Sequence, residues 1–175
     1  MTLTSLPALR LHGLDPILDA GTRLIVLGSF PSVASLRAQR YYAHPQNQFW
    51  KILGVLWGLP LHDMNYQART DALRAHGLGV WDVYAACERE GSLDSAIENA
   101  QRNDLASLKT RCPRLQAIAH NGGESFKHAR HTRALGLPVY RLPSTSPANA
   151  SWTFERKLAA WREVFAAHGL TQQEA

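Results

Sequence analysis

The sequence predicts an α/β fold in which helices cover both faces of a four-stranded parallel sheet. Short aliphatic runs bounded by Gly, Pro or polar residues alternate with segments of helical periodicity, and this alternation is typical of parallel sheets. The first run, RLIVL at residues 23–27, leads into Gly28. Three more follow: GVWDV at 79–83, LQAIA at 115–119 and PVYRL at 138–142. Their length and their aliphatic, β-branched content predict buried strands.

Helical patterns separate these strands and follow the last one. The final pattern places Leu158, Trp161 and Phe165 on one face before Gly169 ends it. The earlier helices are expected at residues 49–56, 66–76, 105–111 and 124–135. The elements together predict a three-layer α/β sandwich.

Length and composition favour one compact domain. The 175 residues, 45% of them hydrophobic, suffice for a proper core. We therefore predict a single domain over residues 1–175, with its core at about 21–169. Cys87 and Cys112 are the only cysteines, and neither stands in a CxxC motif, which argues against zinc or iron–sulfur sites. We expect two buried, reduced thiols, no metal and no cofactor.

Charge and hydropathy limit the partners. Lys and Arg outnumber Asp and Glu by 19 to 14, so the surface should attract polyanions weakly. No apolar run approaches the roughly 18 residues of a membrane span, and the N-terminal segment lacks the pattern of a signal peptide. We expect a cytoplasmic monomer that does not bind membranes.

The strand ends are where the chemistry is expected. Open parallel sheets bind ligands at the carboxyl ends of their strands. The loops beginning at Gly28, Asp82, His120 and Leu142 should therefore share one edge of the sheet.

Two loops in the first third of the chain stand out. GSFPSVAS at 28–35 is neither GxGxxG nor a P-loop, and it suits a tight strand-to-helix connection as well as a pocket wall. YYAHPQNQFW at 41–50 sets Asn47 among four aromatic residues, where an amide needs polar partners. An aromatic pocket with one fixed amide suits a flat heterocycle.

Two further loops follow the third and fourth strands. In HNGGES at 120–125, Asn121 follows a buried strand directly, and the two glycines let backbone approach a ligand. LPSTSPAN at 142–149 carries three hydroxyls, two prolines and an asparagine. A helix N-cap and an ordinary Ser/Pro turn are the plain alternatives. The convergence of all four loops on one sheet edge favours a site.

The order GSFPS, YYAHPQNQFW, HNGG and LPSTSPAN resembles the uracil-DNA glycosylase superfamily, in detail its hypoxanthine (deoxyinosine) branch. The resemblance runs from about Arg23 to the last helix, and LPSTSPAN together with HPxNxFW is its most specific part. It implies a four-stranded parallel sheet between helices and a partner that is double- or single-stranded DNA containing a deaminated base. It also implies a monofunctional enzyme that flips out hypoxanthine or uracil and hydrolyses the N-glycosidic bond, leaving an abasic site.

The resemblance implies roles for individual residues. Phe49 is expected to stack on the flipped base, and Asn121 to read its polar edge. The other base-binding residues would be Gly28, Ser29, Phe30 and Tyr42. DNA contacts are expected from Thr145, Ser146 and Asn149, and catalytic roles from Asn47 and Ser144.

The sequence departs from the wider superfamily at two positions. Phe30 stands where most relatives carry an Asp or Asn that positions the attacking water, and Leu142 stands where many carry His. The water-positioning role is therefore expected to fall to Asn47, whose amide can orient a water but is not basic near neutral pH. Asn121 and backbone N–H groups would stabilise charge on the departing base. The four loops contain no lysine, so Schiff-base chemistry is not expected.

Other polar residues have plainer interpretations. Four histidines lack the spacing of a metal site: His44, His120, His128 and His131. Four acidic residues are interpreted as loop and cap residues: Asp82, Glu88, Glu90 and Asp94. Four basic residues suit either phosphate contacts or a solvated face: Lys127, Arg130, Arg133 and Arg141.

Two other classes of function stay open at this stage. One is a hydrolase with a serine nucleophile, although the sequence has no GxSxG elbow. The other is a DNA- or nucleotide-binding module without catalysis.

Overall fold

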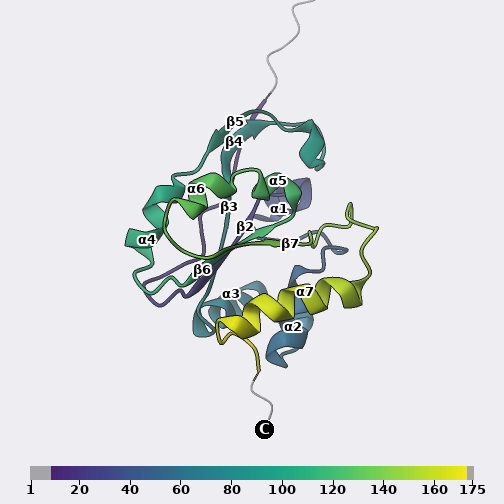
Figure 1. Cartoon of the computed structure of the whole chain (residues 1–175). Helices are drawn as coiled ribbons and strands as arrows, with labels where there is room; N and C mark the ends of the chain where they lie inside the picture. The colour runs from purple at the N-terminus through teal and green to yellow at the C-terminus, as the bar shows by residue number, and fades with distance from the viewer. Residues whose placement is uncertain (1–8, 173–175) are drawn as a thin grey trace, which may run out of the picture.

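The computed structural model describes residues 9–172 and has the predicted parallel sheet at its centre (Figure 1). All neighbouring strands in the sheet are parallel. The spatial order is β3-β2-β6-β7. Each strand begins and ends within two residues of its predicted range: β2 (Leu24–Gly28), β3 (Leu78–Asp82), β6 (Ala117–Asn121) and β7 (Val139–Leu142).

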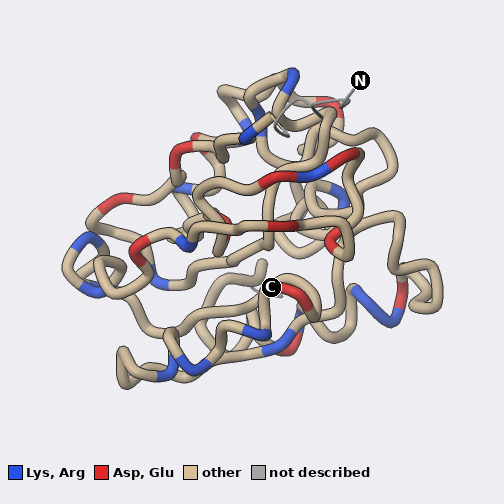
Figure 2. The backbone as a smooth tube through the Cα atoms, turned by 90° about the horizontal axis from the view of Figure 1, so that it is seen from above, with Lys and Arg blue, Asp and Glu red and all other residues tan. Residues whose placement is uncertain are grey.

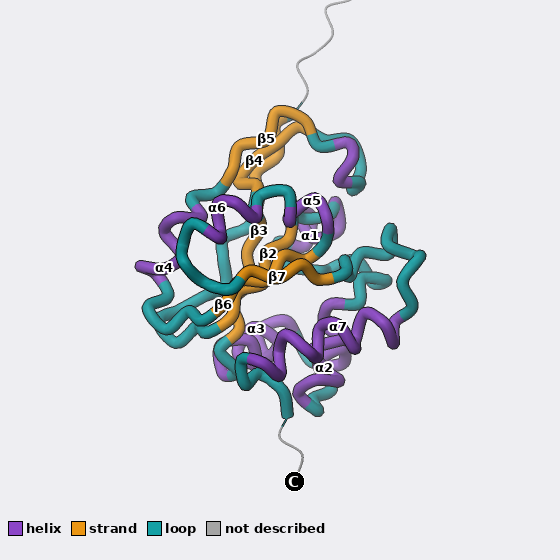
Figure 3. The backbone as a smooth tube through the Cα atoms, in the orientation of Figure 1, coloured by secondary structure: helices purple, strands orange, loops and turns teal. Residues whose placement is uncertain are grey.

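Helices lie on both sides of this sheet, which confirms the three-layer α/β sandwich (Figure 3). One side carries α2 (Phe49–Trp57), α3 (Tyr66–Ala75) and α7 (Phe154–Ala167). The other side carries α1 (Val33–Ala38), α4 (Leu108–Arg111), α5 (Gly123–Phe126) and α6 (Ala129–Arg133).

Strand β2 is apolar at every position from Leu24 to Leu27 because both faces of the sheet are covered. Leu24 and Val26 pack into the core between the sheet and α2, α3 and α7. Ile25 and Leu27 point to the opposite face and pack into the second core. All four side chains are fully buried, because successive residues of a strand face opposite sides and both sides are covered here.

A second, antiparallel sheet was not predicted. It contains β1 (Arg10–His12), β4 (Tyr84–Glu88) and β5 (Glu98–Arg102) in the order β1-β4-β5. It lies beyond the α5 and α6 side of the main sheet (Figure 1). β5, with the sequence ENAQR, is exposed along its whole length, and β1 has three residues. Neither strand has the apolar alternation that marks a half-buried strand in a sequence.

Two predicted helices are interrupted. The segment 105–111 begins as a 3-10 turn, η3 (Leu105–Ser107), before α4. The segment 124–135 is divided into α5 and α6, each of which turns a hydroxyl toward the fully buried ring of His120. Ser125 Oγ and Thr132 Oγ1 each lie 2.8 Å from a ring nitrogen. Two further 3-10 turns are η1 (Leu61–Asp63) and η2 (Asp94–Ala96).

The packed region begins earlier than residue 21. Ile17 forms an isolated bridge with Val80 and is buried in the core. The ends of the predicted domain, residues 1–8 and 173–175, lie outside the described residues. Cys87 and Cys112 are buried free thiols, as predicted. Between residues 9 and 172, no helix combines the length and the apolar character that crossing a bilayer requires.

Candidate active site

A cavity of about 680 Å³ opens at the carboxyl edge of the parallel sheet. Residues that end or follow all four strands line it, together with residues from 41–47 and 92–95. β3 and β6 flank β2 on opposite sides, so the chain connections diverge at this edge. Parallel sheets bind ligands at such switch points, and the volume suits a small-molecule group.

Gly28 and Asp82 stand opposite each other in the β2–β3 ladder and line the cavity. A Cβ at position 28 would lie 2.5 Å from Asp82 Oδ1 and 3.2 Å from Tyr42 Oη. The missing side chain of Gly28 therefore lets a carboxyl group and a phenol hydroxyl approach the same point of the cavity.

Asp82 is a buried carboxyl group, with 5% of its surface exposed. Its Oδ2 has no hydrogen-bond partner among the described residues. Burial, followed by the nearby charge of Asp94, raises the pKa of Asp82 to about 7, while Arg89 acts in the opposite direction. The interpretation of Asp82 as a loop or cap residue is wrong, because its side chain caps no helix and faces the cavity instead.

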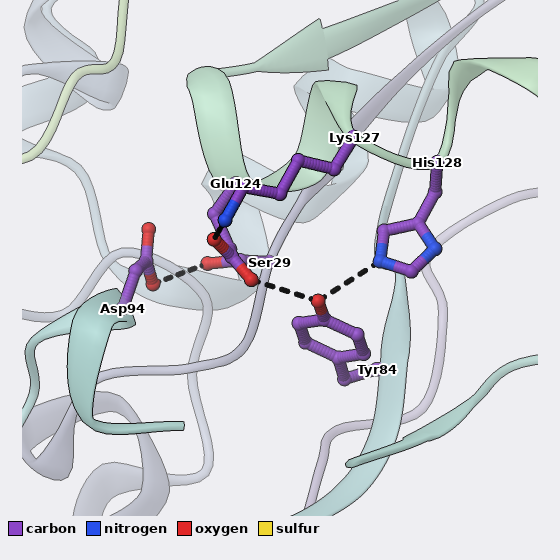
Figure 4. A network of polar contacts seen from close by, with 6 residues as sticks. All are labelled: Ser29, Tyr84, Asp94, Glu124, Lys127 and His128. Atoms are coloured by element: carbon purple, nitrogen blue, oxygen red, sulfur yellow. Dashed lines mark hydrogen bonds and ion pairs between the residues drawn. The ribbon is translucent and has the colours of Figure 1, made fainter. Parts of the chain in front are cut away.

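Ser29 directs its hydroxyl toward a second acidic residue of the wall. Ser29 Oγ donates a hydrogen bond to Asp94 Oδ1 at 2.6 Å, linking the end of β2 to η2 (Figure 4). Burial raises the pKa of Asp94, and the hydrogen bond from Ser29 lowers it. Ser29 therefore lines the cavity as expected, with its hydroxyl already engaged by a protein acceptor.

A neighbouring polar network links β4 to α5 (Figure 4). Tyr84 Oη donates to Glu124 Oε1 at 2.9 Å and lies 2.9 Å from His128 Nε2. Lys127 Nζ donates to the other oxygen of Glu124 at 2.7 Å. Lys127 is thus an exposed residue with an ion-pair partner on its own helical turn.

Tyr42 places its ring in the cavity wall, whereas Phe49 does not reach it. The two rings are stacked, with centroids 4.1 Å apart and planes 26° apart. Phe49 is fully buried at the start of α2, in the core shared with α7. The expectation that Phe49 itself stacks on a base is therefore wrong in this structure, because Tyr42 covers the ring.

The backbone explains how Tyr42 reaches this position. Its φ is +53°, in the left-handed region that residues with a side chain rarely adopt. Such conformations are costly and gather at functional sites. Burial and the charge of Asp82 raise the pKa of Tyr42, so its hydroxyl stays protonated at neutral pH.

Asn47 lies in the cavity wall on the segment that leads into α2. Its Oδ1 accepts a hydrogen bond from the Phe49 backbone N–H at 2.9 Å. Its backbone N–H donates to the His44 carbonyl at 3.0 Å. The amide is therefore held in one orientation, and its Nδ2 makes no hydrogen bond with residues 9–172.

Asn121 fastens three parts of the wall together. Its Nδ2 donates to Tyr42 Oη at 3.2 Å and to Thr145 Oγ1 at 3.0 Å. Its Oδ1 accepts from the Thr145 backbone N–H at 3.1 Å. Thr145 is fully buried, so the expectation that Thr145 contacts DNA is wrong: its hydroxyl and its N–H both serve Asn121.

The rest of the 142–149 loop is held by its own polar groups. Ser144 Oγ accepts from the Ser146 N–H, and Ser146 Oγ accepts from the Ala148 N–H. Asn149 Nδ2 donates to the Ser144 carbonyl. Ser144, Ser146 and Asn149 line the cavity, so the structure brings these predicted residues together with Asn47.

Phe30 also lines the cavity and is 7% exposed. The Arg89 guanidinium lies 5.2 Å from the centre of its ring. Phe30 therefore contributes an apolar surface at the position where the sequence resemblance implied a water-positioning group in other proteins.

Several lining residues were not predicted to form the site. Besides Asp82 and Asp94, they include Arg141 and Trp152. The strand-end position of Asp82 placed it at this edge of the sheet, but its side chain was interpreted as a loop or cap group. Arg141 precedes Leu142 in β7 and was considered only as a possible phosphate contact. Asp94 and Trp152 had no comparable signal, since loop packing brings them to the cavity.

Basic residues are spread over the molecule with acidic residues between them (Figure 2). Among the described residues, Arg141 is the one Lys or Arg in the cavity wall. Arg141 and Arg133 both lie over the Phe126 ring, at 5.5 Å and 5.4 Å. Arg133 is on α6 and Arg141 is on β7, so Phe126 of α5 is contacted by guanidinium groups from two elements, of which only Arg141 lines the cavity.

Comparisons with known proteins match this geometry. The family described as Uracil DNA glycosylase superfamily matches residues 16–165. The hypoxanthine DNA glycosylases of Methanosarcina barkeri and Methanosarcina acetivorans are each 38% identical to the chain over 154 residues, which cover 88% of this chain and 97% of theirs.

A solved structure shares the fold. The NMR solution structure of a Methanosarcina acetivorans protein described as a candidate uracil DNA glycosylase superposes with a TM-score of 0.80 at 36% identity. The match covers 89% of this chain and 99% of that one. The family match spans most of the chain, and sequence and fold agree. The chain therefore belongs to the uracil DNA glycosylase superfamily.

Proposed function

We propose that this protein is a monofunctional DNA glycosylase that excises hypoxanthine from DNA by hydrolysing the N-glycosidic bond. The observation that carries the proposal is that Tyr42, Asn47 and Asn121 line one cavity at the carboxyl edge of the sheet. The protein is also 38% identical to two hypoxanthine DNA glycosylases.

The cavity suits a base that has left the helical stack. The Tyr42 ring, supported from behind by Phe49, offers an aromatic face for a purine. Asn121 Oδ1 accepts one hydrogen bond from Thr145 and retains a second acceptor position. That position can accept the N1–H of hypoxanthine, a group that adenine lacks.

Asn47 is proposed to hold the attacking water. Hydrolysis at C1′ needs a water on the face opposite the departing base, and an amide fixed in one orientation can supply that positioning. The hydrogen bond from the Phe49 N–H fixes Asn47, which leaves its Nδ2 to bind the water. Ser144 is proposed to assist on the same wall, and Ser146 and Asn149 to contact the damaged strand at the mouth.

Hypoxanthine is proposed as the preferred base and uracil as a poorer substrate. The Phe30 side chain makes the first loop apolar where a water-positioning group would serve uracil excision. Duplex and single-stranded DNA are both proposed partners, because a base is flipped at lower cost where it is mispaired or unpaired.

The two other classes of function are less well supported. Ser125, the serine beside His120, is fully buried and donates its hydroxyl to the Leu27 carbonyl, so it cannot act as an exposed nucleophile. A binding module without catalysis is less well supported, because the two relatives at 38% identity are both named as glycosylases. Only an activity measurement separates that module from the enzyme.

The test is an excision panel. Duplexes with inosine, uracil, xanthine or thymine opposite each normal base are incubated with the protein and then treated with alkali, and strand breaks are quantified. Breaks at inosine, with fewer at uracil and none in the undamaged duplex, are expected. Binding of inosine duplex without alkali-labile sites would identify a binding module.

A further inference from the structure

Asp82 lines the cavity and carries one buried oxygen, Oδ2, that has no hydrogen-bond partner among the described residues. A buried carboxylate without partners is costly unless it is protonated or meets a ligand. The position is specific, because a side chain at Gly28 would collide with Asp82 Oδ1.

The surroundings of Asp82 favour its neutral form. Asp94, from η2, adds a negative charge, and Tyr41 and Tyr42 face it from the segment before α2. Arg89, beyond β4, is the opposing positive charge, but its guanidinium donates to the Pro31 and Gly91 carbonyls. Burial and Asp94 together raise the pKa of Asp82 to about 7, so a carboxylic acid is well populated near neutral pH.

We propose that Asp82 is a catalytic acid that gives its proton to the departing base. This inference rests on the proposed glycosylase function. Asp82 lies at the strand end beside Gly28 and Tyr42, in the part of the cavity where we place the base. A neutral carboxyl can donate to the base, whereas the amides of Asn47 and Asn121 can hydrogen-bond but cannot transfer a proton.

The step balances without a further reactant. The bond between C1′ and the base breaks, its electron pair stays on the base, and the proton of Asp82 moves to an acceptor atom of that base. The water held by Asn47 forms the new bond to C1′ through its oxygen. The proton that the water releases returns to the Asp82 carboxylate through solvent, so hypoxanthine and an abasic site are the only products.

The test compares Asp82→Asn with Asp71→Asn. Asn keeps the shape of Asp82 but cannot give up a proton, and Asp71 is an exposed residue of α3 remote from the cavity. On inosine duplex, Asp82→Asn should lower the single-turnover excision rate by about 10²-fold or more, the scale of general acid catalysis. Its Kd should stay within about threefold, and Asp71→Asn should match the parent. Thermal unfolding checks that both variants fold.

The pH profile separates proton transfer from a structural role. The parent rate should fall as pH rises above about 7, because the acid is then ionised, and Asp82→Asn should lack this decline. An Asp82→Asn rate within threefold of the parent, or a slow variant that keeps the parent's alkaline decline, overturns the inference while the glycosylase proposal stands. A parent protein that excises no base overturns the proposed function itself.

Discussion

The ring of Tyr42 lies on the ring of Phe49, with centroids 4.1 Å apart, and only Tyr42 of the two lines the cavity. Phe49 lies in the core, and Tyr42 lies over it and lines the cavity.

This arrangement predicts that Tyr42→Ala weakens base recognition. Base–aromatic stacking contributes about 1–3 kcal/mol, so affinity for inosine duplex and the excision rate together should fall by roughly 10- to 100-fold. Tyr42→Phe keeps the ring and should stay within a few-fold of the parent. Titration of fluorescent inosine duplex and single-turnover kinetics measure both. An unchanged Tyr42→Ala variant would remove this ring from the base-binding wall.

Phe49→Ala should act through stability instead. Removing a fully buried Phe leaves a cavity in the core and costs about 3–5 kcal/mol of unfolding free energy. Trp57→Phe, a milder change in the same core, is the control and should cost less. Urea unfolding gives both values. A fully stable Phe49→Ala that has lost base recognition would restore Phe49 as the stacking residue.

The sheet was predictable because β2, β3 and β6 are buried along their whole length, and such strands read as continuous apolar runs. The placement of Tyr42 over the Phe49 ring was not predictable. It depends on the left-handed backbone conformation of Tyr42, which no pattern in the sequence predicts. The exposed strand β5 was missed because its polar sequence resembles a loop.

The contribution of Asp82 to stability should change with pH. The carboxyl ionises near pH 4 in the unfolded chain but near pH 7 in the folded protein. Its stabilisation is therefore complete below about pH 4 and is lost as pH rises through 7. Between pH 5 and 8 the unfolding free energy should lose roughly 2–3 kcal/mol from this group. Urea unfolding of the parent and Asp82→Asn at each pH measures the difference. Parallel pH curves for the two proteins would argue against a protonated Asp82.

Non-specific DNA binding should depend on salt. The chain carries a net charge of +5, and contacts with about three to five phosphates would give a slope of log K against log salt of roughly −3 to −4.5. Fluorescence anisotropy with undamaged duplex at several salt concentrations gives the slope. An affinity independent of salt would contradict electrostatic binding.

The Asn47→Ala substitution tests most directly whether the cavity is the site of base excision. The substitution removes an oriented amide from the wall, and the partly exposed loop that carries it should keep its fold and its DNA affinity. Single-turnover release of hypoxanthine from inosine duplex, with Kd measured on the same duplex, is the deciding measurement. We expect the rate to fall by about 10²–10³-fold, the scale of one preorganised polar group at a transition state, with nearly unchanged Kd. Release within a few-fold of the parent rate would contradict the assignment of the attacking water to Asn47.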